Sequence, residues 1–263
     1  GGAVRDSLMG VKSSDKDWVV VGSSPKEMVS NGFKPIGNDF PVFLHPETSE
    51  EYALARTEKK TGTGYGGFTF YYGKDVTLEE DLSRRDFTIN AIAQDDAGVI
   101  IDPFNGQDDI KNKLFRHVSD AFFEDPLRAI RLARFFSYDH LKDFDIDAST
   151  IECIEKIVSS REIADISSDR IWSETERALS NSNPSKYFEK IISLNLLDPY
   201  FSKLTKPSCD SHNNKILRWT ELQINNDFEL GSELPLPNDF KNVVEVCKSA
   251  LELNKDANQE DLI

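Results

Sequence analysis

Short apolar runs separated by turns dominate the first part of the chain. Residues 40–44 and 52–56 are two such runs, and the polar turn between them predicts a β-hairpin. Residues 91–94 and 99–101 flank a short turn that contains glycine, and they predict a second hairpin. Residues 59–67 hold four glycines and two adjacent lysines, which predicts a mobile loop. These features are typical of a mixed α/β domain.

Helix signals occur along the whole chain and replace strand signals from about residue 119. Capping boxes begin at Ser24 and Thr77. Further helix starts are predicted at the serines 167–168 and at Asn183, and residues 239–253 have the pattern of a last helix. The later part of the chain is therefore expected to be helical.

We expect an α+β protein with more than one domain, because 263 residues exceed what a single core usually serves. Residues 1–118 form a mixed-sheet head in this interpretation, residues 119–165 a helical neck, and residues 166–263 a helical body and tail. The sequence opens directly on a glycine turn that should follow a strand, so a first strand is expected upstream of residue 1, and the tail is expected to be shortened.

Composition narrows the class of protein. No apolar run approaches the roughly 20 residues that cross a bilayer, so we expect no membrane partner. The three cysteines are widely spaced and predict free thiols in a reducing cytoplasm. The net charge is −15 and is spread evenly along the chain, whereas nucleic-acid binders more often carry a basic surplus. An RNA partner would therefore have to bind local clusters of cations.

An acidic pair stands at the start of a predicted strand. Asp15 and Asp17 flank Lys16, and an apolar run follows at once. Side chains two residues apart in a strand project from the same face, and carboxylates held this close favour a hard cation such as Mg²⁺ between them. The alternative is a solvated acidic turn.

Two glycines open the chain directly before a predicted helix. Gly1 and Gly2 form a tight turn in which free backbone N–H groups and the helix dipole favour a phosphate, and Arg5 would point toward the same anion. The alternative is an ordinary helix start. Together with a metal and several arginines, this turn suggests a nucleoside triphosphate.

Three arginines follow one another along the helix predicted after Glu124. At about 100° per residue, Arg128, Arg131 and Arg134 span an arc of about 120°, and large apolar residues project within the same arc. Arginines among core-like residues need an anion or another acceptor. A triphosphate or the edge of a base could be this acceptor, and so could acidic side chains of the protein itself. Asp125 and Arg128, at i and i+3, are either a base-pairing couple or a simple helix salt bridge.

Four motifs taken jointly resemble the bacterial CCA-adding enzymes, which are class II tRNA nucleotidyltransferases of the polymerase-β-like superfamily. They lie at residues 1–6, 15–18, 84–91 and 124–128, in the order that this family has, and the similarity runs from residue 1 to about 200. The resemblance implies a nucleotidyltransferase head followed by helical neck, body and tail domains that hold the acceptor arm of tRNA.

The resemblance also implies an activity: Mg²⁺-dependent, template-independent addition of CCA to the 3′ end of tRNA from CTP and ATP, with release of pyrophosphate. Carried over residue by residue, it implies that Asp15 and Asp17 bind the metal and carry the catalysis. The nucleotide would be bound by Gly1, Gly2, Arg5, Arg85, Asp125, Arg128, Arg131 and Arg134, with Asp125 and Arg128 selecting the base.

Related activities remain as alternatives. A bacterial poly(A) polymerase shares most of the head motifs, some tRNA enzymes add only C or only A, and a catalytically inactive tRNA-binding fragment is a candidate from a different class. Glu51 and Glu58 are two candidates for a third metal carboxylate. The oligomeric state is left open.

Overall fold

The computed structural model describes residues 1–12, 16–36, 42–60 and 68–260. The chain divides into two compact units, which we call the head unit (Gly1–Asp125 with Asp145–Cys153) and the helical unit (Pro126–Phe144 with Ile154–Ile263). The expected α+β class is confirmed, with a mixed sheet in the head unit and helices in the other. The three-part division at residues 118 and 165 stays a prediction.

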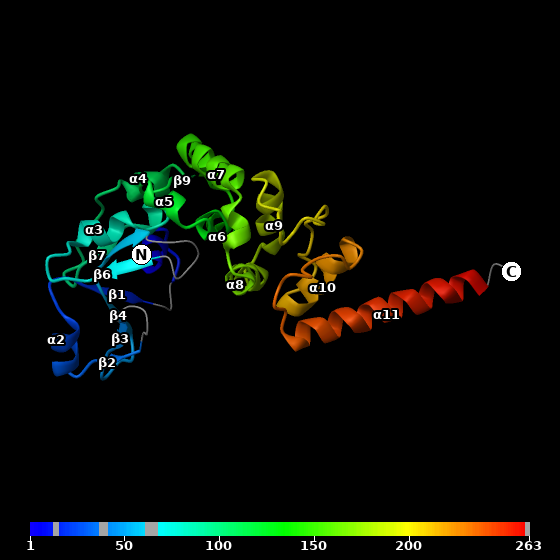
Figure 1. Cartoon of the computed structure of the whole chain (residues 1–263), viewed down its shortest axis with the longest axis horizontal. Coiled ribbons are helices and arrows are strands. Elements are labelled where there is room, and N and C mark those ends of the chain that lie inside the picture. Colours follow the sequence, from blue (N-terminus) through cyan, green and yellow to red (C-terminus); the bar gives the residue numbers. More distant parts are fainter. Residues whose placement is uncertain (13–15, 37–41, 61–67, 261–263) are drawn as a thin grey trace. The chain divides into compact units, whose positions relative to one another are not determined.

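A four-stranded mixed sheet forms the first part of the head unit (Figure 1). Its strands, in spatial order, are β1 (Asp17–Val20), β4 (Glu51–Leu54), β3 (Val42–Leu44) and β2 (Lys34–Pro35). β1 runs parallel to β4, and β3 runs antiparallel to both β4 and β2. A small core joins the sheet to the helix α2 (Pro25–Ser30) through buried Met28, Phe43 and Leu54.

Two hairpins and several short helices complete the head unit. The hairpins are β5 (Thr57–Lys60) with β6 (Phe68–Tyr71), and β7 (Ala93–Gln94) with β8 (Ile100–Ile101). The helices are α1 (Gly2–Leu8), α3 (Leu78–Ser83), the 3-10 helix η2 (Thr88–Asn90), α4 (Gly106–Lys111) and α5 (Ala121–Glu124). Phe87 packs edge-on against Phe115 and Phe122, and all three rings are fully buried.

The head unit includes a second, later segment of the chain. The strand β10 (Asp145–Ile146) pairs in parallel with β9 (Leu114–Phe115). Arg116 forms an ion pair with Asp147 at 2.8 Å, and the backbone N–H of His117 donates to the Thr150 hydroxyl at 2.9 Å. These contacts explain why residues 145–153 belong to the head unit although α6 (Leu127–Phe135), a helix of the other unit, precedes them.

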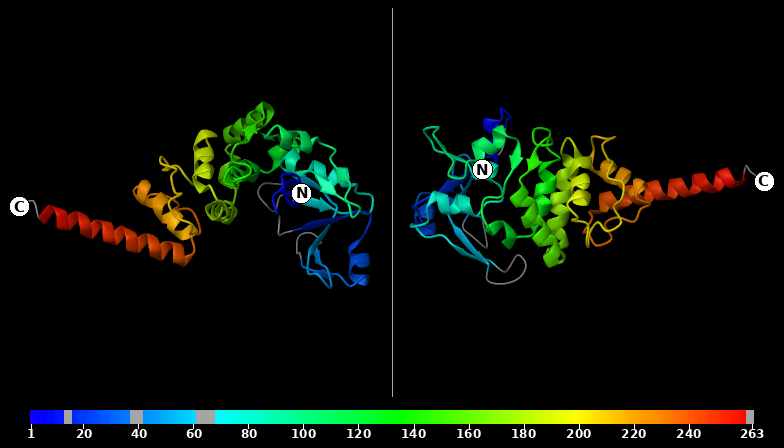
Figure 2. Two further views of the ribbon diagram at one scale, coloured as in Figure 1. Left: turned by 180° about the vertical axis from the view of Figure 1, so that it is seen from behind. Right: turned by 90° about the horizontal axis from the view of Figure 1, so that it is seen from above.

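Helices make up the helical unit. They are α6 (Leu127–Phe135), the later part of α7 (Ala148–Ser160), the 3-10 helix η3 (Glu162–Asp165), α8 (Ser168–Ser180), α9 (Pro184–Ser193), α10 (Lys215–Asn225) and α11 (Asn238–Glu260). α6 packs against α8 and α9, and α10 packs against α8 and α11. Figure 2 shows α11 as one uninterrupted helix that begins beside α10. Trp172 contacts Trp219 and Phe240 edge-on and joins α8, α10 and α11.

Local sequence signals match most of these elements. The Ser24 side chain caps α2, and Thr77 and Glu80 form a complete capping box on α3. Both predicted hairpins are confirmed over the described residues. The predicted loop was wrong at its start, because Lys59 and Lys60 belong to β5; residues 61–67 lie outside the described part. No described helix combines the length and the apolar character that spanning a membrane requires.

Candidate functional site

Two carboxylates meet at one edge of the head sheet. Asp17 is the first residue of β1, Glu51 is the first residue of β4, and the two are paired in register. Paired residues of parallel strands project from the same face, so both exposed side chains lie at the same end of the sheet. Glu58, the other candidate for a third metal carboxylate, binds arginines instead, as described below.

The predicted partner Asp15 lies outside the described residues. Among the residues that are described, no three His, Cys, Asp or Glu side chains cluster closely enough to hold a metal ion. The donors at this edge are carboxylate oxygens, which is the ligand type that Mg²⁺ prefers. The chemistry of Asp17 and Glu51 therefore fits a magnesium ion, with Asp15 as the predicted additional ligand.

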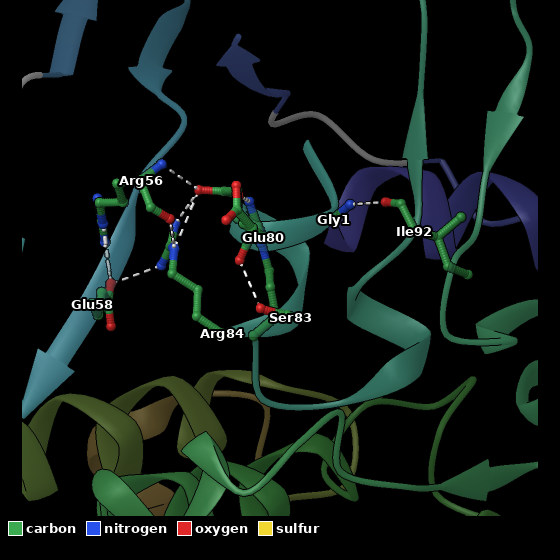
Figure 3. A network of polar contacts seen from close by, with 9 residues as sticks. Gly1, Arg56, Glu58, Glu80, Ser83, Arg84 and Ile92 are labelled. Atoms are coloured by element: carbon green, nitrogen blue, oxygen red, sulfur yellow. Dashed lines mark hydrogen bonds and ion pairs between the residues drawn. The ribbon is translucent and has the colours of Figure 1, made fainter. Parts of the chain in front are cut away.

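The glycine turn lies against two guanidinium groups. Gly1 caps α1, and its carbonyl accepts from the backbone N–H groups of Val4 and Arg5 at 3.1 Å. A methyl group added at Gly1 would lie 3.5 Å from Nη1 of Arg85, and one added at Gly2 would lie 3.7 Å from Nη2 of Arg5. The backbone nitrogen of Gly1 donates to the carbonyl of Ile92 (Figure 3). The turn thus sits where the two predicted phosphate-binding arginines converge.

The charges around Gly1 show which side chains are near the turn. The positive charges of Arg85 and Arg5 act on the backbone nitrogen of Gly1, and the negative charges of Asp17 and Asp81 act on it with the opposite sign. Asp17, Arg5 and Arg85, which the sequence marked as separate candidates, are therefore neighbours of the same turn.

Arg5 is held rigidly from two sides. It is 4% exposed, its Nη1 donates to the Asn90 side-chain oxygen at 2.6 Å, and its Nε donates to Asp6 at 2.8 Å. The amide of Asn90 in turn donates to Asp86 at 2.9 Å. This chain of hydrogen bonds links the first predicted motif to the third, and it fixes the direction of the Arg5 guanidinium.

Arg85 belongs to a charge network centred on Asp81, which is 1% exposed (Figure 3 shows its Arg56–Glu58–Arg84 part). Asp81 accepts from Arg84 at 2.7 Å and from Arg85 at 3.2 Å, and it also accepts from the backbone N–H of Arg56 at 3.2 Å. Glu58 pairs with Arg84 at 2.8 Å and with Arg56 at 3.0 Å. The network ties α3 to the first strand of the β5–β6 hairpin.

Asp125 is not part of the arginine helix. It has an extended backbone at the end of α5, and α6 begins at Leu127 with Pro126 as its N-cap. The expected helical backbone at Asp125 was therefore wrong, whereas the pairing of Asp125 with Arg128 stays a prediction. The reason is steric, because a proline disfavours helical backbone angles in the residue before it. Their selection of the base stays a prediction that does not rest on helical geometry.

The arginines of α6 differ in their surroundings. Arg134 is 4% exposed, pairs through Nε with Glu174 of α8, and donates through Nη1 to the Tyr138 hydroxyl at 2.7 Å. Its guanidinium also lies 4.7 Å from the centre of the Phe135 ring. The side chain of Arg131 is 33% exposed, and its Nη1 lies 3.7 Å from Glu174. For Arg134, an acid of the protein itself provides the acceptor.

Sequence reasoning did not single out Asp81, Asn90 or Glu174. Each is a buried polar residue, and Asn90 and Glu174 bind arginines of other elements. A signal for Glu174 does exist, because it falls in the same i, i+3, i+7 row of α8 as the buried residues Ile171 and Ala178. An acid in such an apolar row needs a buried cation.

Two protein families match separate parts of the chain. The sequence profile of the poly A polymerase head domain matches residues 1–116. A second profile, described as a probable RNA and SrmB-binding site of polymerase A, matches residues 143–206.

Curated relatives are similar over about three quarters of the chain. The multifunctional CCA protein of Alcanivorax borkumensis is 54% identical over 204 residues, which are 78% of this chain and 50% of that protein. The CCA-adding enzyme of Coxiella burnetii is 57% identical over 188 residues, or 72% of this chain and 50% of the enzyme. The chain thus spans about half the length of the curated relatives it matches.

Solved structures share the fold. The Bacillus stearothermophilus CCA-adding enzyme, crystallised in complex with CTP, superimposes with a TM-score of 0.78 at 26% identity, covering 96% of this chain and 65% of that one. The Thermotoga maritima CCA-adding enzyme, complexed with tRNA, gives a TM-score of 0.68 at 24% identity, covering 99% of this chain and 67% of that one.

Proposed function

We propose that this chain belongs to the family of the CCA-adding enzymes and that its protein adds C, C and A to the 3′ end of tRNA from CTP and ATP, without a nucleic-acid template. The observation that carries this proposal is the glycine turn at which Arg5, Arg85 and Asp17 come together. The acceptor arm of tRNA is the proposed partner, and the cytoplasm the proposed location.

We assign Asp15, Asp17 and Glu51 as the residues that hold Mg²⁺. The register that places Glu51 beside Asp17, and the engagement of Glu58 by two arginines, favour Glu51 over Glu58. When bound, the ion would neutralise the triphosphate and activate the attacking 3′ hydroxyl of the tRNA. No histidine base is needed for this chemistry.

The glycine turn is the proposed phosphate site. The absence of side chains on Gly1 and Gly2 lets an anion approach the backbone, while Arg5 and Arg85 supply positive charge from two sides. Asn90 and Asp81 hold these guanidiniums in place, which reduces the entropy lost when a triphosphate binds. Pyrophosphate is then the leaving group.

Base choice is assigned to Asp125 and Arg128, with Arg131 and Arg134 as further nucleotide-site residues. A carboxylate and a guanidinium together offer acceptors and donors that complement the edge of a cytosine or an adenine. The buried ion pair between Arg134 and Glu174 supports a role for Arg134 in orienting α6. Arg128 and Arg131 are proposed to contact the nucleotide directly, and Arg134 to support them within the nucleotide site.

Incubation of the purified chain with a tRNA transcript that lacks its 3′ end, Mg²⁺ and labelled CTP or ATP tests the activity. Addition of two C residues and one A is expected, and no extension at all contradicts the proposal. The match of residues 1–116 to a poly A polymerase head favours one rival, a poly(A) polymerase. Extension of arbitrary RNA with ATP alone, with CTP inert, would establish that rival.

A further inference from the structure

One buried carboxylate faces three arginines inside the helical unit. Glu174 of α8 is 3% exposed. Its Oε2 accepts from Nε of Arg134, while its Oε1 lies 3.7 Å from Arg131 and 3.8 Å from Arg177. The arginine side chains are progressively more exposed, at 5% for Arg134, 33% for Arg131 and 62% for Arg177. The cluster therefore leads from the core of the unit to its surface.

The two oxygens of Glu174 act on two different residues of α6. Arg131 and Arg134 lie at i and i+3, so they project from neighbouring positions on one face of that helix. A carboxylate that contacts both from α8 restricts the rotation of α6 about its own axis. The Tyr138 hydroxyl accepts from Arg134 on the other side of the guanidinium, so Arg134 is held between two partners.

Glu174 lies among buried residues, where its negative charge keeps Arg131 and Arg134 close together. Thr175, Ile171 and Ala178 of the same helix are buried, and the Thr175 hydroxyl bonds to buried Tyr187 of α9 at 3.0 Å. Without the carboxylate, the positive charges of Arg131 and Arg134 would repel each other in a poorly solvated site. The arginines would then separate, and α6 would keep its apolar packing on α8 and α9 but lose the ionic contact that restricts its rotation.

We propose that Glu174 is a positioning residue for nucleotide selection: it fixes Arg131 and Arg134, and so sets the direction from which α6 presents Arg128 to the base. This inference rests on the proposed function. Arg128 is one helical turn before Arg131, so a rotation of α6 displaces both. Glu174 itself does not touch the nucleotide in this scheme.

The test compares Glu174→Gln with Glu176→Gln. Glu176 is on the same helix and pairs at the surface with Lys215 at 2.6 Å, so its substitution removes a carboxylate without altering the contacts of α6. kcat and KM are measured for CTP, ATP and UTP on tRNA that lacks its 3′ end. Glu174→Gln is expected to lower the discrimination against UTP roughly tenfold or more, mainly through higher KM for CTP and ATP. Glu176→Gln is expected to keep the discrimination of the unaltered chain.

Discrimination is the decisive quantity, because a smaller folded fraction lowers the rate with every nucleotide equally. If Glu174→Gln loses its helical circular dichroism, Glu174→Asp decides the question, since it keeps the charge but shortens its reach. An intermediate loss of discrimination supports the proposal, and unchanged discrimination overturns it. If the unaltered chain extends tRNA and both Glu174 variants select nucleotides normally, only the inference fails. If the unaltered chain extends no tRNA, the proposed function fails, and the inference fails with it.

Discussion

Single guanidinium groups in the head unit are oriented by partners that lie close in the sequence, such as Asp6 for Arg5, or far away, such as Asn90 for Arg5. Arg5 is held by Asn90 and Asp6, and Arg85 is held by Asp81. Each partner is itself bonded or buried, so the cations have little freedom to turn toward water. A site of this kind binds an anion with a small loss of conformational entropy. The carboxylates of Asp17 and Glu51 would repel such an anion, so the proposed Mg²⁺ would have to neutralise them.

Asp17→Ala is expected to abolish nucleotidyl transfer and to leave tRNA affinity nearly intact, because the carboxylate acts on the metal and not on the RNA. Extension of labelled tRNA and fluorescence anisotropy of tRNA binding measure the two properties separately. Asp96→Ala, which removes an exposed carboxylate from a turn of the same unit, is the control and should keep activity. Transfer that persists in Asp17→Ala would remove Asp17 from the catalytic site.

Arg128→Ala is expected to reduce the discrimination between CTP, ATP and UTP more than it weakens tRNA binding. The expected loss of discrimination is ~1–3 kcal/mol, the amount that a good bidentate contact from an arginine to a base provides. Competition between labelled nucleotides in one extension reaction measures it. Lys186→Ala on α9, which removes an exposed cation paired with Glu189, is the control. An unchanged nucleotide preference in Arg128→Ala would argue against base selection by this residue.

His117 gives the head unit a dependence on pH. Burial lowers the pKa of His117 below its ordinary value of 6.5, against the opposing charges of Asp120 and Asp147. The folded protein therefore binds fewer protons than the unfolded chain at mildly acidic pH. The stability contribution of this group is complete above the unfolded pKa and is lost as the pH falls through it toward the folded pKa.

Urea unfolding at neutral and mildly acidic pH tests whether His117 lowers the stability of the folded protein on acidification. His117→Gln is expected to lose less stability on acidification than the unaltered chain does. His212→Gln, at an exposed position, should behave like the unaltered chain. A larger acid sensitivity in His117→Gln would show that the sign is wrong.

The sequence identified the cations of the site but not their partners. Arg5, Arg85 and Arg134 stood out because of their motifs and their positions among apolar residues, whereas Asn90 is 85 residues away from Arg5 and Glu174 is 40 residues away from Arg134. Nothing in local periodicity encodes a contact of that span. For Asp125, in contrast, the sequence did contain the signal. Pro126 disfavours a helical backbone at the preceding residue, although the pattern of arginines suggested a helix there.

Short elements in the head unit are held by side-chain bonds as much as by apolar packing. Capping signals at Ser24 and Thr77 were sufficient to predict two helix starts, because a cap is a contact within four residues. The sequence did not predict that β5 extends to Lys60. Lys59 and Lys60 pair with residues of β6 that follow the glycine-rich stretch, and local signals do not show such a pairing. The charge network of Asp81 then connects α3 to this hairpin.

Asp81→Ala is expected to destabilise the head unit by roughly 3–5 kcal/mol, the cost of leaving a buried ion pair with one partner. The substitution leaves Arg84 without its 2.7 Å contact and the Arg56 N–H without its side-chain acceptor. Urea unfolding followed by circular dichroism measures the change. Glu79→Ala, an exposed acid of the same helix, should change stability only slightly. Equal effects of the two substitutions would show that the network does not stabilise the unit.

At the scale of the whole molecule, the resemblance in sequence motifs covers the head unit and only the first part of the helical unit. The resemblance that the motifs carry ends near residue 200, and the matches to curated relatives cover 72–78% of the chain. Beyond that point the fold continues as α10 and α11, which pack on each other and on α8. Their apolar faces are encoded in the sequence, but a partner such as Trp172 for Phe240 becomes evident only in the folded unit.

The acidic charge of the chain imposes a condition on tRNA binding. With a net charge of −15, repulsion from a polyanion acts over the whole surface, so attraction has to come from cations in direct contact with phosphates. Such contacts release counterions, and each neutralised phosphate contributes a slope of roughly 0.7–0.9 to the fall of log affinity with log salt. We therefore expect the affinity for tRNA to fall as KCl rises from about 50 to about 200 mM. Anisotropy titrations with tRNA and with an unrelated RNA hairpin of equal length measure this slope. Similar slopes with a higher affinity for tRNA would show that shape adds to charge, whereas an affinity independent of salt would mean that the chain holds tRNA without phosphate contacts.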